Sequence, residues 1–88
     1  MSSIEKWFVY TLFSPKYNRI YIGMTKRPNE RLKEHNSGKM KSTKGYIPWT
    51  RVFKEKVGSR VEARKREKFY KTTTGRSIIR SIIEESFQ

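Results

Sequence analysis

The sequence has no cysteine and no aspartate, and His35 is its single histidine. Without cysteine there is no disulfide framework, no thiolate zinc site and no cysteine nucleophile. A single histidine excludes a histidine-rich metal site, and the lack of aspartate excludes a Ser-His-Asp triad. Hydrolytic sites that hold two metal ions depend on clusters of carboxylates, usually with aspartate. Any metal site in this chain must therefore work with very few glutamates.

Long hydrophobic runs are also missing. No apolar run approaches the roughly 18 residues that a transmembrane helix needs, so we expect no membrane partner. The N-terminal apolar stretch is interrupted by Glu5 and Lys6 and is stopped by Pro15, so we expect no signal peptide. Together with the lack of cysteine, this pattern favours a cytoplasmic protein.

Positive charge is abundant. Lysine and arginine number 21 against 8 acidic residues, which gives a net charge of +13 in a chain of 88 residues. A chain this short supports one hydrophobic core, so we predict a single domain over residues 1–88. The charge predicts a polyanionic partner, and nucleic acid is favoured over a merely solvated surface or an anionic membrane surface.

Three segments have the composition of β-strands. Residues 7–13 and 19–24 are rich in aromatic and β-branched side chains, and a turn-forming segment separates them. Residues 49–54 predict a third strand, with Pro48 at its entrance, where a missing N–H does least harm. We expect these strands to form a central antiparallel three-stranded sheet.

Pairing within the first hairpin decides which side chains meet. If Phe13 pairs with Asn18 across a four-residue loop, Tyr10 lies directly opposite Tyr21. Paired residues point to the same face with their Cβ atoms about 5 Å apart, so the two phenols would project side by side.

Three other segments predict helices. Residues 28–36 begin with a proline and end before Ser37-Gly38, which is a helix stop signal. Residues 59–71 begin with a capping box, and Ala63, Glu67 and Tyr70 share one face. An apolar stripe at helical spacing predicts a last helix that lies on the sheet: Ile78, Ile79, Ile82 and Ile83. The fold class is therefore α/β (α+β), with helices around a central sheet.

Residues 39–48 form a basic loop that contains glycine. Lys39, Lys41 and Lys44 make it a candidate for following a nucleic-acid backbone, although a merely solvated loop fits equally well. Just before it, Arg31 and His35 are four residues apart on one side of the predicted helix, where both could reach the same object.

Several motifs occur in a recognisable order. Phe8-Val9-Tyr10 is followed by Tyr21-Ile22-Gly23, then by Arg31 ten residues after Tyr21, by His35, and by Glu67 on the capped helix. This series resembles the GIY-YIG nucleases, which include homing endonuclease catalytic domains, some restriction enzymes and the N-terminal domain of the excision-repair endonuclease subunit. The resemblance extends over nearly the whole chain, and Gly75-Arg76 resembles the start of the family's closing helix. Phe8 replaces the family's first glycine, and a polar Asn found near the end of some members has no counterpart.

The resemblance implies a metal-dependent endonuclease that hydrolyses DNA. It implies that Glu67 holds one Mg²⁺ or Mn²⁺ ion, that Tyr10 is the general base and that Tyr21 is a positioner. Mg²⁺ keeps most of its waters, so one carboxylate is a sufficient protein anchor. The residues alone leave open which tyrosine is the base. A phenol with a pKa near 10 is a poor base unless positive charge favours the phenolate, which this chain can offer.

The remaining site residues would hold the phosphate and the DNA. The planar guanidinium of Arg31 suits a phosphate and would clamp the transition state, and His35 would hold a phosphate oxygen or assist proton transfer. We expect further DNA contacts from Gly23, Lys39, Lys41, Lys44 and Arg76.

Other interpretations remain open. The tyrosines could be core aromatics, and Glu67 could be an exposed i+4 partner of Lys71. Arg31 and His35 could belong to a solvated helix face, and Gly23 could mark a bulge or close backbone packing. The domain could be a nucleic-acid-binding module without catalysis, or a small RNA-binding or ribosome-associated protein. If it is a nuclease, we expect a role in DNA repair or recombination and a partner protein that supplies specificity. The oligomeric state cannot be read from the sequence.

Overall fold

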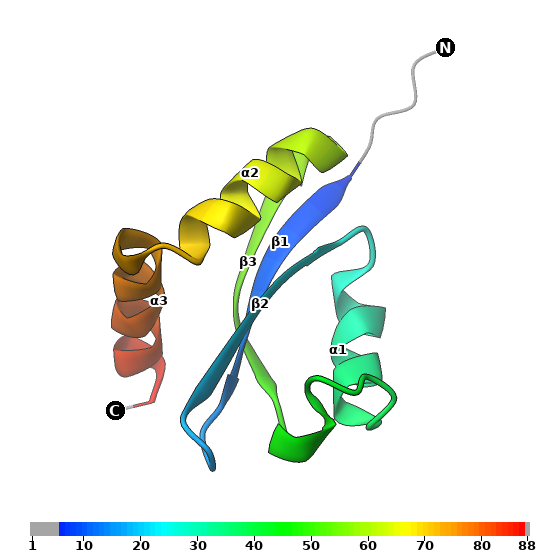
Figure 1. The fold of residues 1–88 in the computed structure, drawn as a ribbon, viewed down its shortest axis with the longest axis vertical. Coiled ribbons are helices and arrows are strands. Elements are labelled where there is room, and N and C mark those ends of the chain that lie inside the picture. The colour runs from blue at the N-terminus through cyan, green and yellow to red at the C-terminus, as the bar shows by residue number, and fades with distance from the viewer. Residues whose placement is uncertain (1–5, 88) are drawn as a thin grey trace.

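A computed structural model describes residues 6–87. Residues 1–5 and 88 lie outside the described residues. The expected ends of the domain and the expected interruption of the N-terminal apolar stretch at Glu5 therefore lie outside them as well. The elements are β1 (Trp7–Ser14), β2 (Arg19–Thr25), α1 (Pro28–Asn36), the 3₁₀ helix η1 (Lys44–Tyr46), β3 (Thr50–Gly58), α2 (Arg60–Tyr70) and α3 (Thr73–Ser86) (Figure 1). Within the described range, no helix combines the length and the hydropathy needed to cross a bilayer.

The three strands form one antiparallel sheet in the order β2-β1-β3, so the predicted sheet is confirmed. The central position of β1 explains why both of its faces are apolar. Val9 and Phe13 belong to one buried cluster, whereas Tyr10 and Leu12 belong to the other. A central strand of this kind positions side chains in two separate cores.

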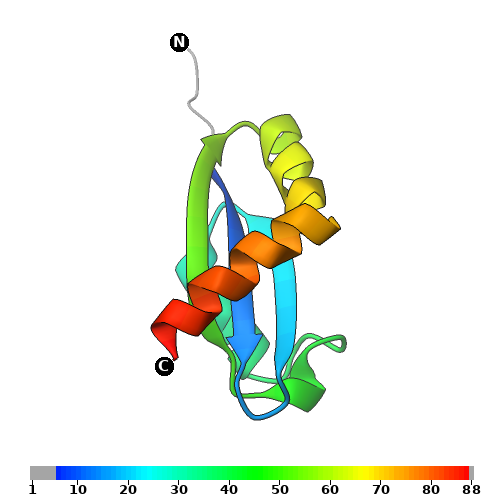
Figure 2. The ribbon, with the colours of Figure 1, turned by 90° about the vertical axis from the view of Figure 1, so that its left-hand side faces the viewer.

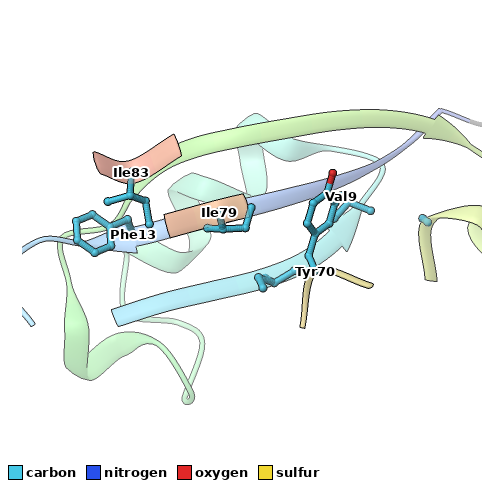
Figure 3. Close-up of a cluster of buried hydrophobic side chains, with 7 residues drawn as sticks. Val9, Phe13, Tyr70, Ile79 and Ile83 are labelled. Carbon is cyan, nitrogen blue, oxygen red and sulfur yellow. The ribbon is translucent and has the colours of Figure 1, made fainter. Parts of the chain in front are cut away.

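Helices cover both faces of the sheet. Helices α2 and α3 lie on one face, and α1 lies with η1 on the other (Figure 1), while Figure 2 shows α3 crossing the sheet obliquely. In the first core, Ile79 and Ile83 of α3 pack in the same cluster as Val9, Phe13 and Tyr70 (Figure 3). The predicted apolar stripe is thus confirmed at its centre.

Ile78 lies at the edge of this stripe and is 42% exposed. Ile82 is partly buried against the same core. The stripe is therefore narrower than the sequence spacing indicates, because the sheet reaches only one side of the helix.

The register of the first hairpin differs from the expected one by two residues. Tyr10 pairs with Gly23 rather than with Tyr21. The cause is Asn18, which adopts a positive φ of 52° and closes the turn instead of pairing with Phe13. Side chains alternate between faces with a period of two, so this shift leaves the two tyrosines on the same face.

Local signals define the helices well. Helix α1 has the predicted bounds, and α2 begins with the predicted capping box: Ser59 Oγ accepts from the Glu62 N–H at 3.1 Å, and the Ser59 N–H donates to Glu62 Oε1 at 3.2 Å. Strand β3, in contrast, continues past Lys54 to Gly58, because it pairs with β1 along its whole length despite its charged residues.

A polar cluster fixes α2 on β3. Arg66 Nε donates to Glu55 Oε1 at 3.1 Å, and the Tyr70 hydroxyl donates to the same oxygen at 3.2 Å. Ala63, Glu67 and Tyr70 are buried on one face of the helix, as predicted. This attachment sets the direction in which the Glu67 carboxylate can point.

Candidate active site

Tyr10 lies in the middle of β1 and is only 2% exposed. Its phenol lies over Gly23 of β2: a Cβ placed on that glycine would stand 2.6 Å from Tyr10 Oη and 2.8 Å from Cζ. Gly23 therefore makes the space that the phenol occupies, in agreement with the interpretation of close backbone packing. Its expected contact with DNA stays a prediction.

His35 of α1 is fully buried and binds Tyr10. Its Nε2 lies 3.0 Å from Tyr10 Oη, and its Nδ1 lies 2.9 Å from Thr43 Oγ1. The Thr43 hydroxyl donates to the Met40 carbonyl at 3.4 Å, so its oxygen accepts from the Nδ1–H of the imidazole. Nε2 is then left as the acceptor for the Tyr10 O–H. The network thus fixes the direction of both hydrogen bonds.

The imidazole is held in its neutral form. Burial lowers the pKa of His35, the positive charge of Arg31 lowers it further, and Glu34 opposes the shift. A neutral ring is what the hydrogen bond from Tyr10 requires, because a protonated imidazole has no acceptor nitrogen.

The Tyr10 phenol is held in its protonated form. Burial is the main cause that raises its pKa, and the neighbouring Tyr21 phenol raises it further, whereas Arg31 lowers it. The expectation that the positive charge of the chain favours a Tyr10 phenolate is therefore wrong. Loss of hydration around the phenol outweighs the guanidinium.

Tyr21 completes the buried aromatic group. Its ring centroid lies 4.8 Å from that of His35 and 6.2 Å from that of Tyr10. The two tyrosines therefore lie side by side around the imidazole, although they are not directly paired across the strands.

Glu67 approaches this group from α2. It is 9% exposed, and its negative charge is near enough to raise the pKa of Tyr10. Its Oε2 pairs with Lys71 Nζ at 3.3 Å, and its Oε1 pairs with Arg64 Nη1 at 3.6 Å. The i+4 ion pair between Glu67 and Lys71 does form. Glu67 is nevertheless buried, so the interpretation of Glu67 as an exposed partner of Lys71 is wrong.

Glu67 would have to act as a metal ligand outside any larger cluster of ligating side chains. Among residues 6–87 there is no group of three or more histidine, cysteine or acidic side chains that could hold a metal ion. A lone carboxylate fits Mg²⁺ or Mn²⁺ bound mainly through water and substrate oxygens, and it does not fit a tightly held structural ion.

Arg31 lies at the rim of the buried group. It shares its helix side with His35, but its side chain is 37% exposed and pairs with Glu34 at 3.3 Å. A hollow of about 370 Å³ opens beside it between α1, α2 and the end of β2. The cations that line this hollow are Lys26, Arg27, Arg31, Arg60 and Arg64.

Sequence reasoning missed the residues that hold the loop beneath His35. The Asn36 side chain accepts from the Trp49 N–H at 2.6 Å and donates to the Trp49 carbonyl at 3.0 Å, while the Trp49 indole donates to the Thr43 carbonyl at 2.9 Å. Thr43 is 1% exposed. Nothing in the spacing marks Thr43, since a threonine in a basic loop looks like any solvated residue.

The expected DNA-contacting cations lie outside the buried group. Lys39, Lys41 and Lys44 are exposed on the loop that Thr43 anchors. Arg76 is exposed at the start of α3, where its Nε donates to the Lys71 carbonyl at 3.3 Å. The structure therefore brings together the expected catalytic residues, with the expected DNA-contacting cations on the surrounding surface.

The chain is similar to known proteins. The structure-specific endonuclease subunit slx1 of Xenopus laevis is 49% identical over 51 residues, which cover 50% of this chain and 18% of that protein. The chain thus spans less than a fifth of that relative's length. No solved structure matches the chain significantly. The model of the GIY-YIG catalytic domain matches residues 6–80, so the chain belongs to this family of nucleases.

Proposed function

We propose that this protein is a divalent-metal-dependent endonuclease that hydrolyses phosphodiester bonds in DNA. The observation that carries the proposal is the buried hydrogen-bonded series Tyr10–His35–Thr43, which lies within electrostatic reach of both Arg31 and Glu67. A core aromatic would need neither a neutral histidine as its acceptor nor a carboxylate and a guanidinium near its hydroxyl.

Tyr10 acts as a relay in this proposal. Its oxygen accepts a proton from the attacking water while its own proton moves to Nε2 of the neutral His35. The resulting imidazolium keeps its Nδ1–H bond to Thr43. The hydroxide forms a bond to phosphorus, and the bond from phosphorus to the 3′ oxygen breaks. A phenol with a raised pKa can work in this way because it never has to exist as a free phenolate.

Arg31 neutralises the phosphate. Its surface ion pair with Glu34 contributes little to stability, so the guanidinium can exchange that carboxylate for non-bridging phosphate oxygens. The planar fork makes two parallel hydrogen bonds to such oxygens. The phosphate's negative charge would also favour the imidazolium that forms on His35.

Glu67 would hold one Mg²⁺ or Mn²⁺ ion. Its oxygens now pair with Lys71 and Arg64, whose side chains are 48% and 62% exposed and can turn to the phosphates of bound DNA. The carboxylate then becomes free for a cation. When bound, the ion would neutralise the phosphate and stabilise charge on the leaving oxygen.

The biological setting is the last part of the proposal. The similar Xenopus laevis protein is a subunit of a structure-specific endonuclease. That likeness favours DNA as the substrate and a partner protein that supplies specificity for this chain. A role in DNA repair or recombination is our extension of the proposal.

Cleavage assays test the proposal directly. Supercoiled plasmid and structured oligonucleotides are incubated with Mg²⁺, Mn²⁺ or EDTA, using wild type, Glu67→Ala and the exposed α3 control Glu84→Ala. We expect Glu67→Ala to abolish nicking and to leave DNA binding nearly intact, while the control cleaves as wild type does. Unchanged cleavage by Glu67→Ala rejects the assignment. Salt-sensitive binding without cleavage at any metal concentration favours the non-catalytic module, and tight preference for RNA favours the RNA-binding alternative.

A further inference from the structure

The hollow beside Arg31 has a mixed lining that phosphate binding alone does not explain. Besides its cations it is lined by Trp7 and Met24, which supply an aromatic ring and a thioether, and by the carboxylates of Glu30 and Glu34. Its volume of about 370 Å³ is in the range of sites that enclose a small organic molecule. A site for bare phosphate gains nothing from carboxylates, because they repel the ligand.

Each part of the lining matches one part of a nucleotide. Guanidinium groups bind phosphate oxygens, and an aromatic ring stacks on a base. Carboxylates accept hydrogen bonds from exocyclic amino groups such as N4 of cytosine. We propose that this hollow binds one unpaired nucleotide of the DNA strand, with its base against Trp7 and its phosphate among the arginines.

Two arginines connect the hollow to the buried group. Arg31 lines the hollow and also lowers the pKa of Tyr10, while Arg64 lines the hollow and pairs with Glu67 at 3.6 Å. A phosphate bound between them lies next to the Glu67 carboxylate. The unpaired nucleotide is therefore adjacent to the bond that is cut, a step that rests on the proposed nuclease function.

The Trp7 ring lies beside the hollow and is held in place, because it packs against the first core. Lys26 Nζ lies 5.5 Å from its ring centroid, and the indole N–H has no acceptor in the part of the chain that the structure describes. Packing and the cation thus hold the ring without a directional hydrogen bond. A base in a continuous duplex is stacked between its neighbours and cannot reach such a ring, so the hollow selects strands with an unpaired base.

The test measures binding in EDTA, so that it does not depend on cleavage. Fluorescein-labelled duplexes of equal length, one fully paired and one with a single bulged cytosine, are titrated with wild type and variants. Trp7→Leu should lower the preference for the bulge roughly 5- to 150-fold, the range for loss of one stacked base. The matched control Tyr17→Leu removes an exposed aromatic from the hairpin tip and should keep the preference. Unchanged preference in a folded Trp7→Leu variant overturns the proposal.

A second variant decides the matter even if Trp7→Leu fails to fold. Glu30 is exposed, so Glu30→Ala should fold. It should weaken binding of the bulged cytosine roughly 2- to 10-fold, the value of one hydrogen bond, and leave duplex binding unchanged. Stronger binding of both DNAs would indicate a plain phosphate site and would overturn the proposal. Metal-dependent cleavage by wild type is scored separately, so failure of the nuclease function and failure of this site give different results.

Discussion

Gly23→Ala is the most direct test of how the Tyr10 phenol is positioned. The new Cβ would stand 2.6 Å from Tyr10 Oη, 2.8 Å from Tyr10 Cζ and 3.0 Å from Tyr21 Cε2. Nonbonded carbon contacts normally lie near 3.5 Å or beyond, so the phenol must retreat by about 1 Å. Because Tyr10 is buried and bound to His35 at 3.0 Å, it cannot move without lengthening or bending that hydrogen bond.

The expected loss is larger in activity than in stability. Overpacking of a buried site costs about 1–3 kcal/mol of unfolding free energy, and each kcal/mol lowers Tm by about 4–8 °C in a domain of this size. A misplacement of about 1 Å at the reacting centre costs roughly 100-fold in rate. DNA affinity should stay near that of wild type, since the surface cations are untouched.

The assay compares single-turnover plasmid nicking in Mg²⁺, DNA binding by anisotropy and thermal unfolding by circular dichroism. Gly45→Ala is the matched control, because a Cβ at that glycine meets nothing within 4 Å. It should behave as wild type does in all three measurements. If folded Gly23→Ala nicks DNA within about threefold of wild type, Tyr10 is not held as the structure indicates and the relay is refuted.

The other predictions concern the histidine, its support and the helix junction. Burial holds the pKa of His35 below its usual value of about 6.5, so nicking should run at its full rate at neutral pH and slow as the ring is protonated at lower pH. Stability should likewise decline as pH drops below about 6.5. Rate and melting profiles of wild type check both effects; His35→Gln should not nick DNA, and its melting profile should lack the decline. Thr43→Val removes the acceptor for Nδ1–H and should lower kcat about 10- to 100-fold with unchanged DNA binding, by analogy with other supporting hydrogen bonds to histidine. Gly75→Ala would drive a Cβ into the backbone of Phe69 and Tyr70, so Tm should drop while the residual folded protein keeps its metal dependence.

Elements governed by local chemistry could be predicted from the sequence. The proline at the start of α1 and the capping box of α2 act within one helical turn, so both helices begin where expected. The end of β3 and the register of the first hairpin could not be predicted in this way. The first depends on pairing with β1 across the sheet, and the second on a left-handed conformation at Asn18 that no neighbouring residue specifies.

The candidate site, too, could be predicted from the sequence only in part. The resemblance selected Tyr10, Tyr21, His35 and Glu67, and the structure brings them together. The resemblance carried no information on Thr43, whose role depends on a single hydrogen bond to the His35 imidazole. Residues that match the family pattern predict which side chains meet. The tautomer of a histidine depends on its hydrogen-bond partner, which only the coordinates show.

The wrong expectation for Tyr10 shows why the net charge of a protein does not predict the pKa of a buried group. A charge of +13 acts from the surface through water, where screening weakens it beyond about 10 Å. Burial acts on the phenol directly and raises its pKa, so the one nearby guanidinium of Arg31 cannot make it a phenolate. A protonated phenol is useless as a base unless its proton has somewhere to go, and the neutral Nε2 of His35 is the acceptor within 3.0 Å. The same burial that disables Tyr10 as a free base also keeps His35 neutral, so one physical cause prepares both ends of the proton path.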